Sequence, residues 1–190
     1  MRVITGLYKG RVLRTVRDLS VRPATGRVRQ TIFDMLAHRI ELEGSQTLDL
    51  FAGSGSLGIE CLSRGAEHVT FVEYDAQAVR YLEENIRMLG CEDRTEIIPM
   101  DAMAFLRGRP EAFDIVFADP PYAFGDTAAI PACVLQAGFL APGGYLVIEH
   151  STELRFAQTG AFRITDEKRF GRTMVTFIRH QPDERRTETP

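Results

Sequence analysis

The sequence lacks several features that would assign it to particular classes of protein. Its apolar runs are all shorter than the roughly 18 residues that a membrane-spanning helix needs, and its first residues contain no secretory hydrophobic segment. Cys61, Cys91 and Cys133 are too few and too scattered for a disulfide framework or a zinc site. There is no internal repeat and no low-complexity tract. We therefore expect a cytoplasmic protein, in a reducing environment, with no metal and no membrane contact.

Charge is distributed unevenly along the chain. The 190 residues carry a formal net charge of -3, yet residues 1–39 hold nine basic and two acidic residues, whereas the remainder holds 14 basic and 24 acidic residues. A basic segment on an acidic body indicates contact with a polyanion such as nucleic acid, although small basic segments are also often merely solvated. The candidate contact residues in this segment are Lys9, Arg11, Arg22, Arg27 and Arg29.

Length and composition predict one globular domain with a small appendage. We expect residues 1–40 to form a basic extension, residues 41–180 the main domain, and residues 181–190, which offer nothing apolar to bury, a disordered tail. The extension is predicted to contain a hairpin with strands at 3–4 and 12–13, followed by a helix capped by Thr25. The apolar residues of that helix share one face, and we expect Arg27 and Arg29 to point elsewhere. Those apolar residues are Val28, Ile32, Met35 and Leu36.

Apolar strands and amphipathic helices alternate from residue 47 onward. This alternation predicts an α/β fold of the doubly wound, Rossmann-like type, with a parallel sheet covered on both faces. Two final strands joined at Gly171 should pair antiparallel. The expected strands are 47–51, 68–73, 95–98, 113–118, 144–149, 162–170 and 173–178, and the expected helices are 57–64, 76–89, 102–106 and 126–136.

A glycine-rich loop joins the first strand of the main domain to the first helix that follows it. Glycines there allow the backbone to approach a ligand, and the helix start offers free N–H groups. Glu73 ends the next strand, 20 residues after Gly53, where a carboxylate can accept both hydroxyls of a ribose. The loop residues expected to bind a cofactor are Phe51, Ala52, Gly53, Ser54 and Gly55, with Tyr74 beside Glu73.

This pattern fits either NAD or S-adenosylmethionine (SAM), and two carboxylates favour SAM. Asp49 lies within the strand end, where it would attract an ammonium group and repel a pyrophosphate. Asp101, followed by Ala102, comes after the third strand, where it can pair with an adenine amino group. Asp101 is also a good helix N-cap, and it can serve in both roles.

The turn Asp119-Pro120-Pro121-Tyr122 follows the fourth strand. In a doubly wound sheet the first and fourth strands are neighbours, so this turn should face the glycine loop. Asp119 and the Pro120 carbonyl can each accept an N–H of an amine, which would direct the nitrogen lone pair toward a methyl donor. Tyr122 would stack on a base that has left its own stack. We expect Asp119 to Tyr122 to be catalytic, with Asp119 also touching the cofactor.

Several stretches together resemble the class I SAM-dependent methyltransferases of the bacterial 16S rRNA guanine-N2-methyltransferase (RsmD) type. They are the opening Arg2 to Gly6 with Lys9 to Arg11, the stretch Arg22 to Arg29, the stretch Leu48 to Gly55 with Leu62 to Ala66, and Asp119 to Tyr122. Gly26 departs from this resemblance, since the family is expected to have an acidic residue there.

The resemblance implies a seven-stranded sheet of order 3-2-1-4-5-7-6 with an antiparallel last strand. It also implies SAM as donor, guanine N2 of 16S rRNA as acceptor, and RNA contact by the N-terminal extension. The partner would be 16S rRNA or the small ribosomal subunit particle, and we expect a monomer. Three other readings stay open: a methyltransferase acting on DNA adenine N6 or a glutamine amide, an NAD-linked oxidoreductase, and a noncatalytic RNA-binding assembly factor.

Overall fold

The computed structural model describes residues 1–15, 26–157 and 160–181. Thr25, expected to cap the first helix, Arg22, and the tail beyond Gln181 lie outside the described residues. None of the helices in the described part is both long and apolar enough to cross a bilayer.

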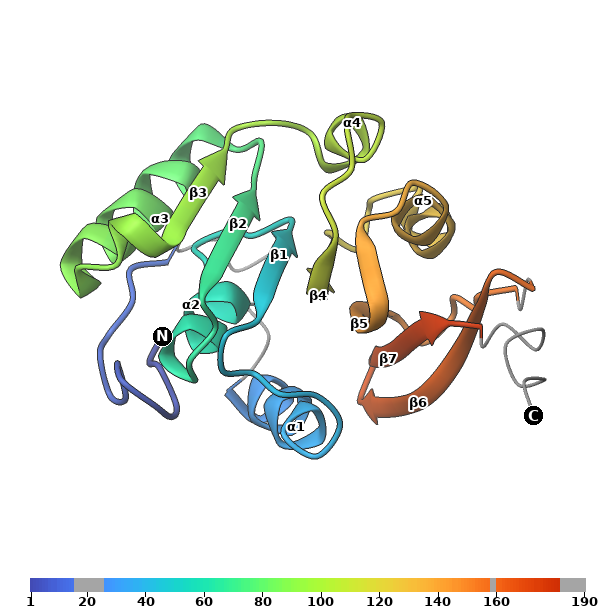
Figure 1. The fold of residues 1–190 in the computed structure, drawn as a ribbon, viewed down its shortest axis with the longest axis horizontal. Helices are drawn as coiled ribbons and strands as arrows, with labels where there is room; N and C mark the ends of the chain where they lie inside the picture. Colours follow the sequence, from blue (N-terminus) through green and yellow to red (C-terminus); the bar gives the residue numbers. More distant parts are fainter. Residues whose placement is uncertain (16–25, 158–159, 182–190) are drawn as a thin grey trace, which may run out of the picture.

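A seven-stranded mixed sheet in the order β3-β2-β1-β4-β5-β7-β6 forms the centre of the fold (Figure 1). The first five strands are parallel, and β7 is antiparallel to both β5 and β6. This confirms the predicted order and the antiparallel last strand. The strands are β1 (Gln46–Leu50), β2 (His68–Val72), β3 (Thr95–Ile98), β4 (Phe113–Ala118), β5 (Leu140–Ser151), β6 (Phe162–Phe170) and β7 (Thr173–His180).

Helices cover both faces of this sheet, with α1, α2 and α3 on one side and α4 and α5 on the other (Figure 1). Their bounds are α1 (Gly26–Leu36), α2 (Ser56–Ser63), α3 (Ala76–Leu89), α4 (Ala102–Phe105) and α5 (Ile130–Gln136), with 3-10 turns η1 (Glu92–Arg94) and η2 (Thr127–Ala129). The single helix expected over 126–136 is therefore a 3-10 turn followed by α5.

Local sequence explains where these helices begin and end. Asp75 caps α3 by accepting hydrogen bonds from the backbone N–H groups of Gln77 and Ala78, and Gly90 ends the helix in the left-handed conformation. Asp101 caps α4 by accepting from the N–H of Ala104, which confirms the capping role expected for it. Both caps hold the turns at the carboxyl edge of the sheet in fixed positions.

The N-terminal extension shares a core with the sheet rather than forming one of its own. Val3, Leu13 and Phe33 belong to the same buried cluster as apolar residues of β2, β4, β5 and β7. Within residues 1–15, the expected hairpin strands are reduced to one antiparallel bridge between Arg2 and Val12, flanked by a few backbone hydrogen bonds. The segment is therefore held by packing and side-chain contacts more than by strand pairing.

Candidate active site

The glycine loop and the Asp119 turn begin side by side at the carboxyl edge of the sheet. β1 and β4 are hydrogen-bonded neighbours, and Leu50 pairs in register with Ala118. The loop that starts at Phe51 and the turn that starts at Asp119 therefore leave the sheet at the same level, as the strand order requires. An edge-to-face contact between Phe51 and Phe124, with ring centroids 5.0 Å apart, joins the two segments again beyond the sheet.

The backbone of the glycine loop is tightly constrained. Phe51 has a φ of 60°, the one left-handed φ among the described non-glycine residues, and such strain clusters at ligand sites. Gly58 lies so close to β2 that a Cβ there would meet a ring carbon of Phe71 at 2.3 Å. The backbone N–H of Gly58 donates to Asp49 Oδ2 at 2.9 Å. This contact fixes the start of α2 above the end of β1.

Glu73 links the glycine loop to the turn after β2. Its Oε2 accepts from the N–H of Gly53 at 2.7 Å, and its Oε1 accepts from the N–H of Asp75 at 2.8 Å. Each carboxylate oxygen has a second lone pair that these bonds leave over. Tyr74, the next residue, is largely exposed. The carboxylate is thus held between the glycine loop and the turn after β2.

Three carboxyl side chains, those of Asp49, Glu73 and Asp119, lie close together at this site. Their electrostatics indicate whether a cationic cofactor fits. Burial raises the pKa of Asp49 well above its usual range; the Gly58 N–H lowers it, while Asp119 and Glu73 raise it further. Burial also raises the pKa of Asp119, to about 7. No ion pair among the described residues neutralises these three groups. A ligand bearing sulfonium and ammonium charges, as SAM does, would relieve this repulsion.

Asp49 lies deeper than expected from the sequence. Its side chain is buried, and its assigned partner is the helix N–H of Gly58. It therefore lies beneath the loop, with oxygen lone pairs that the Gly58 contact leaves over.

Glu149 belongs to the same cluster of buried carboxyl side chains as Asp119, and it was not identified from the sequence. It follows Ile148, which pairs in register with Ala118, so Glu149 adjoins Asp119 across the β4–β5 pair. Burial and then the charge of Asp119 raise the pKa of Glu149 to about 8, and its Oε2 is buried without a hydrogen-bond partner in the described structure. A single acidic residue ending the apolar stretch from Tyr145 to Ile148 was the available signal.

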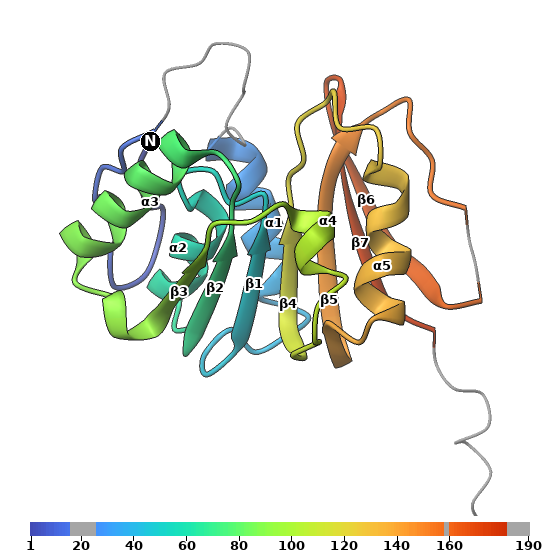
Figure 2. The same ribbon diagram turned by 90° about the horizontal axis from the view of Figure 1, so that it is seen from above.

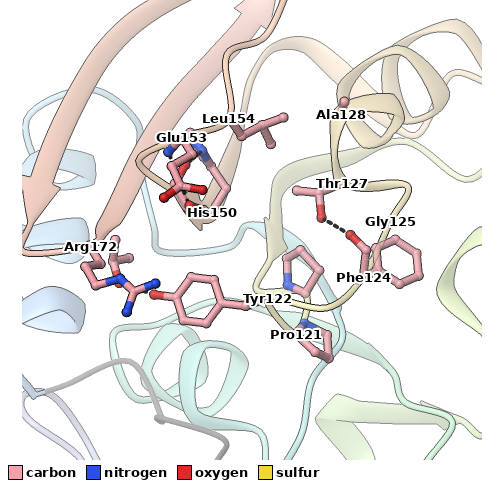
Figure 3. Close-up of a pocket in the computed structure, with 13 residues that line it drawn as sticks. Pro121, Tyr122, Phe124, Gly125, Thr127, Ala128, His150, Glu153, Leu154 and Arg172 are labelled. Atoms are coloured by element: carbon pink, nitrogen blue, oxygen red, sulfur yellow. Dashed lines mark hydrogen bonds between the residues drawn. The ribbon is translucent and has the colours of Figure 1, made fainter.

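A cavity of about 680 Å³ opens beside the Asp119 turn (Figure 3), and no glycine-loop residue is among those that line it. Pro120, Pro121 and Tyr122 form one wall, and residues at the end of β5 and the start of β7 form the other. The Tyr122 ring is 58% exposed, and its hydroxyl contacts the hydroxyl of Thr173. The cavity is large enough for a planar ring system to lie against Tyr122.

The basic residues expected at a polyanion site divide into two groups. Lys9, Arg11 and Arg27 are exposed, and Arg11 also donates to the carbonyl of Met88. The expectation for Arg29 is wrong. Its side chain is 2% exposed and donates to the carbonyl of Arg2 and to the sulfur of Met1. Arg29 lies on the inner face of α1, where it holds the N-terminal segment and cannot reach a phosphate.

Within the residues that the structure describes, no group of three His, Cys, Asp or Glu side chains is arranged to hold a metal ion. The described residues therefore form a glycine loop with carboxyl groups at its base, a proline-containing turn that begins with Asp119, and a cavity with an aromatic wall.

The chain matches known proteins over nearly its full length. The family model described as "Conserved hypothetical protein 95" matches residues 1–179. The "Putative rRNA methyltransferase YlbH" of Bacillus subtilis is 36% identical, over 94% of this chain and 98% of its own. The "Ribosomal RNA small subunit methyltransferase D" of Haemophilus influenzae is 37% identical, over 78% of each chain.

Among solved structures, the "Putative methyltransferase yhhF" from Escherichia coli superimposes with a TM-score of 0.84 at 31% identity, covering 95% of this chain and 98% of that one. The family model, the relatives and this superposition agree on the family and on the fold. The chain therefore belongs to the Conserved hypothetical protein 95 family, the RsmD-type class I methyltransferases that use S-adenosylmethionine as methyl donor.

Proposed function

We propose that this protein transfers a methyl group from SAM to the exocyclic N2 amine of a guanine in 16S rRNA of the small ribosomal subunit. The observation that carries the proposal is the Asp119-Pro120-Pro121-Tyr122 turn, which leaves the sheet in register with the glycine loop. The Bacillus subtilis relative, which matches 94% of this chain, is named as a putative rRNA methyltransferase, and relatives from Haemophilus influenzae and Escherichia coli, which match 78% and 80% of it, are named as small-subunit rRNA methyltransferases.

The cofactor side of the reaction rests on residues of β1, β2 and the loops after them. Gly53 and Gly55 let the backbone approach the methionine part, Glu73 holds the ribose hydroxyls, and Asp101 accepts from the adenine amine. Asp49 and Asp119 supply negative charge near the ammonium and sulfonium groups. SAM supplies an electrophilic methyl group on its sulfur.

The acceptor side rests on the turn after β4. The exocyclic amine of guanine is a weak nucleophile because its lone pair is delocalised into the ring. Asp119 and the Pro120 carbonyl each accept one amine N–H, and this fixes the direction in which the lone pair points. After methylation the amine loses one proton, which the Asp119 carboxylate can take because it accepts an amine N–H in this arrangement.

Tyr122 offers the guanine a stacking surface worth roughly 1–3 kcal/mol. The base must leave its helix or loop stack to reach it. Lys9, Arg11, Arg22 and Arg27 would contact RNA phosphates at the N-terminal extension. We propose a monomeric enzyme, because no described residue of the site requires a second copy, and a cytoplasmic one, because its proposed substrate is ribosomal RNA.

The test is transfer of tritiated methyl from SAM to 16S rRNA and to small-subunit particles from a strain that lacks the enzyme. Nucleoside analysis of the product should yield N2-methylguanosine. If the product were N6-methyladenosine, or if the label were found in protein glutamine, the acceptor would be that amine and not guanine N2. No transfer to either substrate, despite SAM binding, would point to the noncatalytic assembly factor.

A further inference from the structure

The turn between β6 and β7 carries positive charge up to the wall of the acceptor cavity. Arg172 lines the cavity, and it lies next to Tyr122 in Figure 3. Lys168 and Arg169, on the last part of β6, are exposed on the same hairpin. This hairpin was expected only as an antiparallel strand pair, and none of the basic residues assigned above to RNA contact belongs to it.

The position of this turn is fixed by contacts at three points. The N–H of Thr152 donates to the carbonyl of Arg172 at 3.0 Å. Thr173, the next residue, contacts the hydroxyl of Tyr122. The Arg169 side chain donates to the carbonyl of Gly171 at 3.0 Å, inside the turn itself. Arg172 therefore projects from an ordered platform that is tied directly to the amine-binding turn.

The guanidinium of Arg172 has donors to spare. Arg172 is exposed, and none of the ion pairs or side-chain hydrogen bonds found among the described residues includes its guanidinium. Glu153 lines the same cavity but lies beyond ion-pair distance. An arginine fork at the edge of an aromatic-walled cavity suits the ligand that such a cavity would admit, a nucleotide with its base inside and its phosphate outside.

We propose that the β6–β7 turn is a phosphate-binding site for single-stranded RNA, in which Arg172 holds the backbone of the strand whose base lies against Tyr122. Lys168 and Arg169 extend the contact to neighbouring phosphates. The strand would thus be held on the β7 side of the cavity, at the far end of the sheet from residues 1–15, which lie against α3 (Figure 2). The assignment of a guanine to the cavity rests on the proposed function, whereas the phosphate contact does not depend on methyl transfer.

The test measures binding of a fluorescently labelled oligomer of 12 uridines across a range of KCl concentrations. This probe contains no guanine, so it reports phosphate and stacking contacts alone. Each phosphate contact on single-stranded RNA adds about 0.7 to the slope of log affinity against log salt. We expect Arg172→Gln to lower that slope by about 0.7 and to weaken binding about fivefold, while Arg172→Lys keeps most of both.

Arg109→Gln is the matched control, because Arg109 is exposed and lies before the amino-terminal end of β4, whereas the cavity lies at the carboxyl-terminal end of that strand. It should leave slope and affinity unchanged. In methyl transfer to 16S rRNA, Arg172→Gln should raise KM and leave kcat within about twofold.

Equal slopes for Arg172→Gln and Arg109→Gln would overturn the phosphate site, and so would wild-type binding that does not depend on salt. Failure of the wild type to methylate 16S rRNA, with the uridine slopes as expected, would overturn the proposed function and leave the phosphate site standing.

Discussion

Replacing Arg29 by methionine should weaken the fold and leave RNA binding unchanged. Arg29 Nε lies 3.8 Å from Glu60 Oε2, and the two side chains are 2% and 1% exposed. Glu60 also binds Arg64 at 2.9 Å and accepts from the N–H groups of Ile4 and Thr5. This buried group joins α1, α2 and the N-terminal segment.

The loss of unfolding free energy depends on which contacts Glu60 and Arg2 keep when the arginine is replaced. Removing one member of a buried ion pair costs about 3–5 kcal/mol when the other charge is left uncompensated. Glu60 would keep Arg64 and two backbone donors, and methionine would fill much of the space of the arginine stem. The carbonyl of Arg2 would lose a hydrogen bond worth about 1 kcal/mol. We therefore expect Arg29→Met to lower the free energy of unfolding by about 2 kcal/mol.

Glu60→Gln should cost more, about 4 kcal/mol, because Arg29 and Arg64 would then be buried side by side without a counter-charge. The ordering of the two variants is a sharper test than either value alone.

The assay is urea unfolding at pH 7, with RNA affinity measured across salt concentrations. For a chain of this length, a loss of 2 kcal/mol corresponds to about 4–8 °C in Tm. Arg27→Met is the matched control on the same helix; it should leave stability within about 0.5 kcal/mol and lower the salt slope. Full stability of Arg29→Met together with a lowered salt slope would refute the buried role of Arg29.

The other predictions concern the carboxylates and the glycine loop. Asp119→Ala should bind SAM within a few-fold of wild type by calorimetry yet lose turnover, and unchanged turnover would refute the amine contact. Wild-type kcat/KM for SAM should rise with pH through about 7, the pKa of Asp119 in the free protein, because the ionised carboxylate is the stronger acceptor for the amine N–H group, and Asp119→Asn should remove that step. The pKa of Glu149 is raised from 4.5 to about 8, so its stabilising contribution is full below about 4.5 and is lost as pH rises to 8. The stability gained by Glu149→Gln should therefore grow over that range, while the exposed Glu153→Gln shows no such trend; a constant difference would contradict the burial of this carboxyl. Gly58→Ala should cost about 1–3 kcal/mol, measured by urea unfolding, because its Cβ would overlap the Phe71 ring.

Much of the fold could be predicted because strand and helix signals agree along the main domain. Apolar runs ending in an acidic or glycine-rich turn located β1, β2, β3 and β4 to within one residue at each end. β5 is longer than expected, since it begins at Leu140, and its pairing with β4 is irregular between Phe113 and Ile115. The Pro142-Gly143-Gly144 stretch concealed that start, because those residues ordinarily argue against a strand.

Arg29 was misplaced because the buried face of α1 is wider than the one inferred. Phe33 and Leu36 follow Arg29 by four and seven residues, so all three share a face, and all three are buried. Glu60 was the available signal, since an acidic residue within the apolar helix α2 needs a buried partner. Pairing across 31 residues cannot be read from either helix alone.

The anchoring of the first residues has a consequence for what the protein can recognise. Glu60 ties Ile4 and Thr5 to α2, and Arg14 is bonded to Asn85 and Glu84 of α3. Lys9 and Arg11 lie between these two anchors, so their separation from the cavity at Tyr122 is set by the protein core. The distance from these two basic residues to the cavity is therefore fixed, and a ligand that contacts both places must span that distance. A fixed distance favours a rigid, folded target, because a flexible strand can contact the cavity without contacting Lys9 and Arg11, or the reverse.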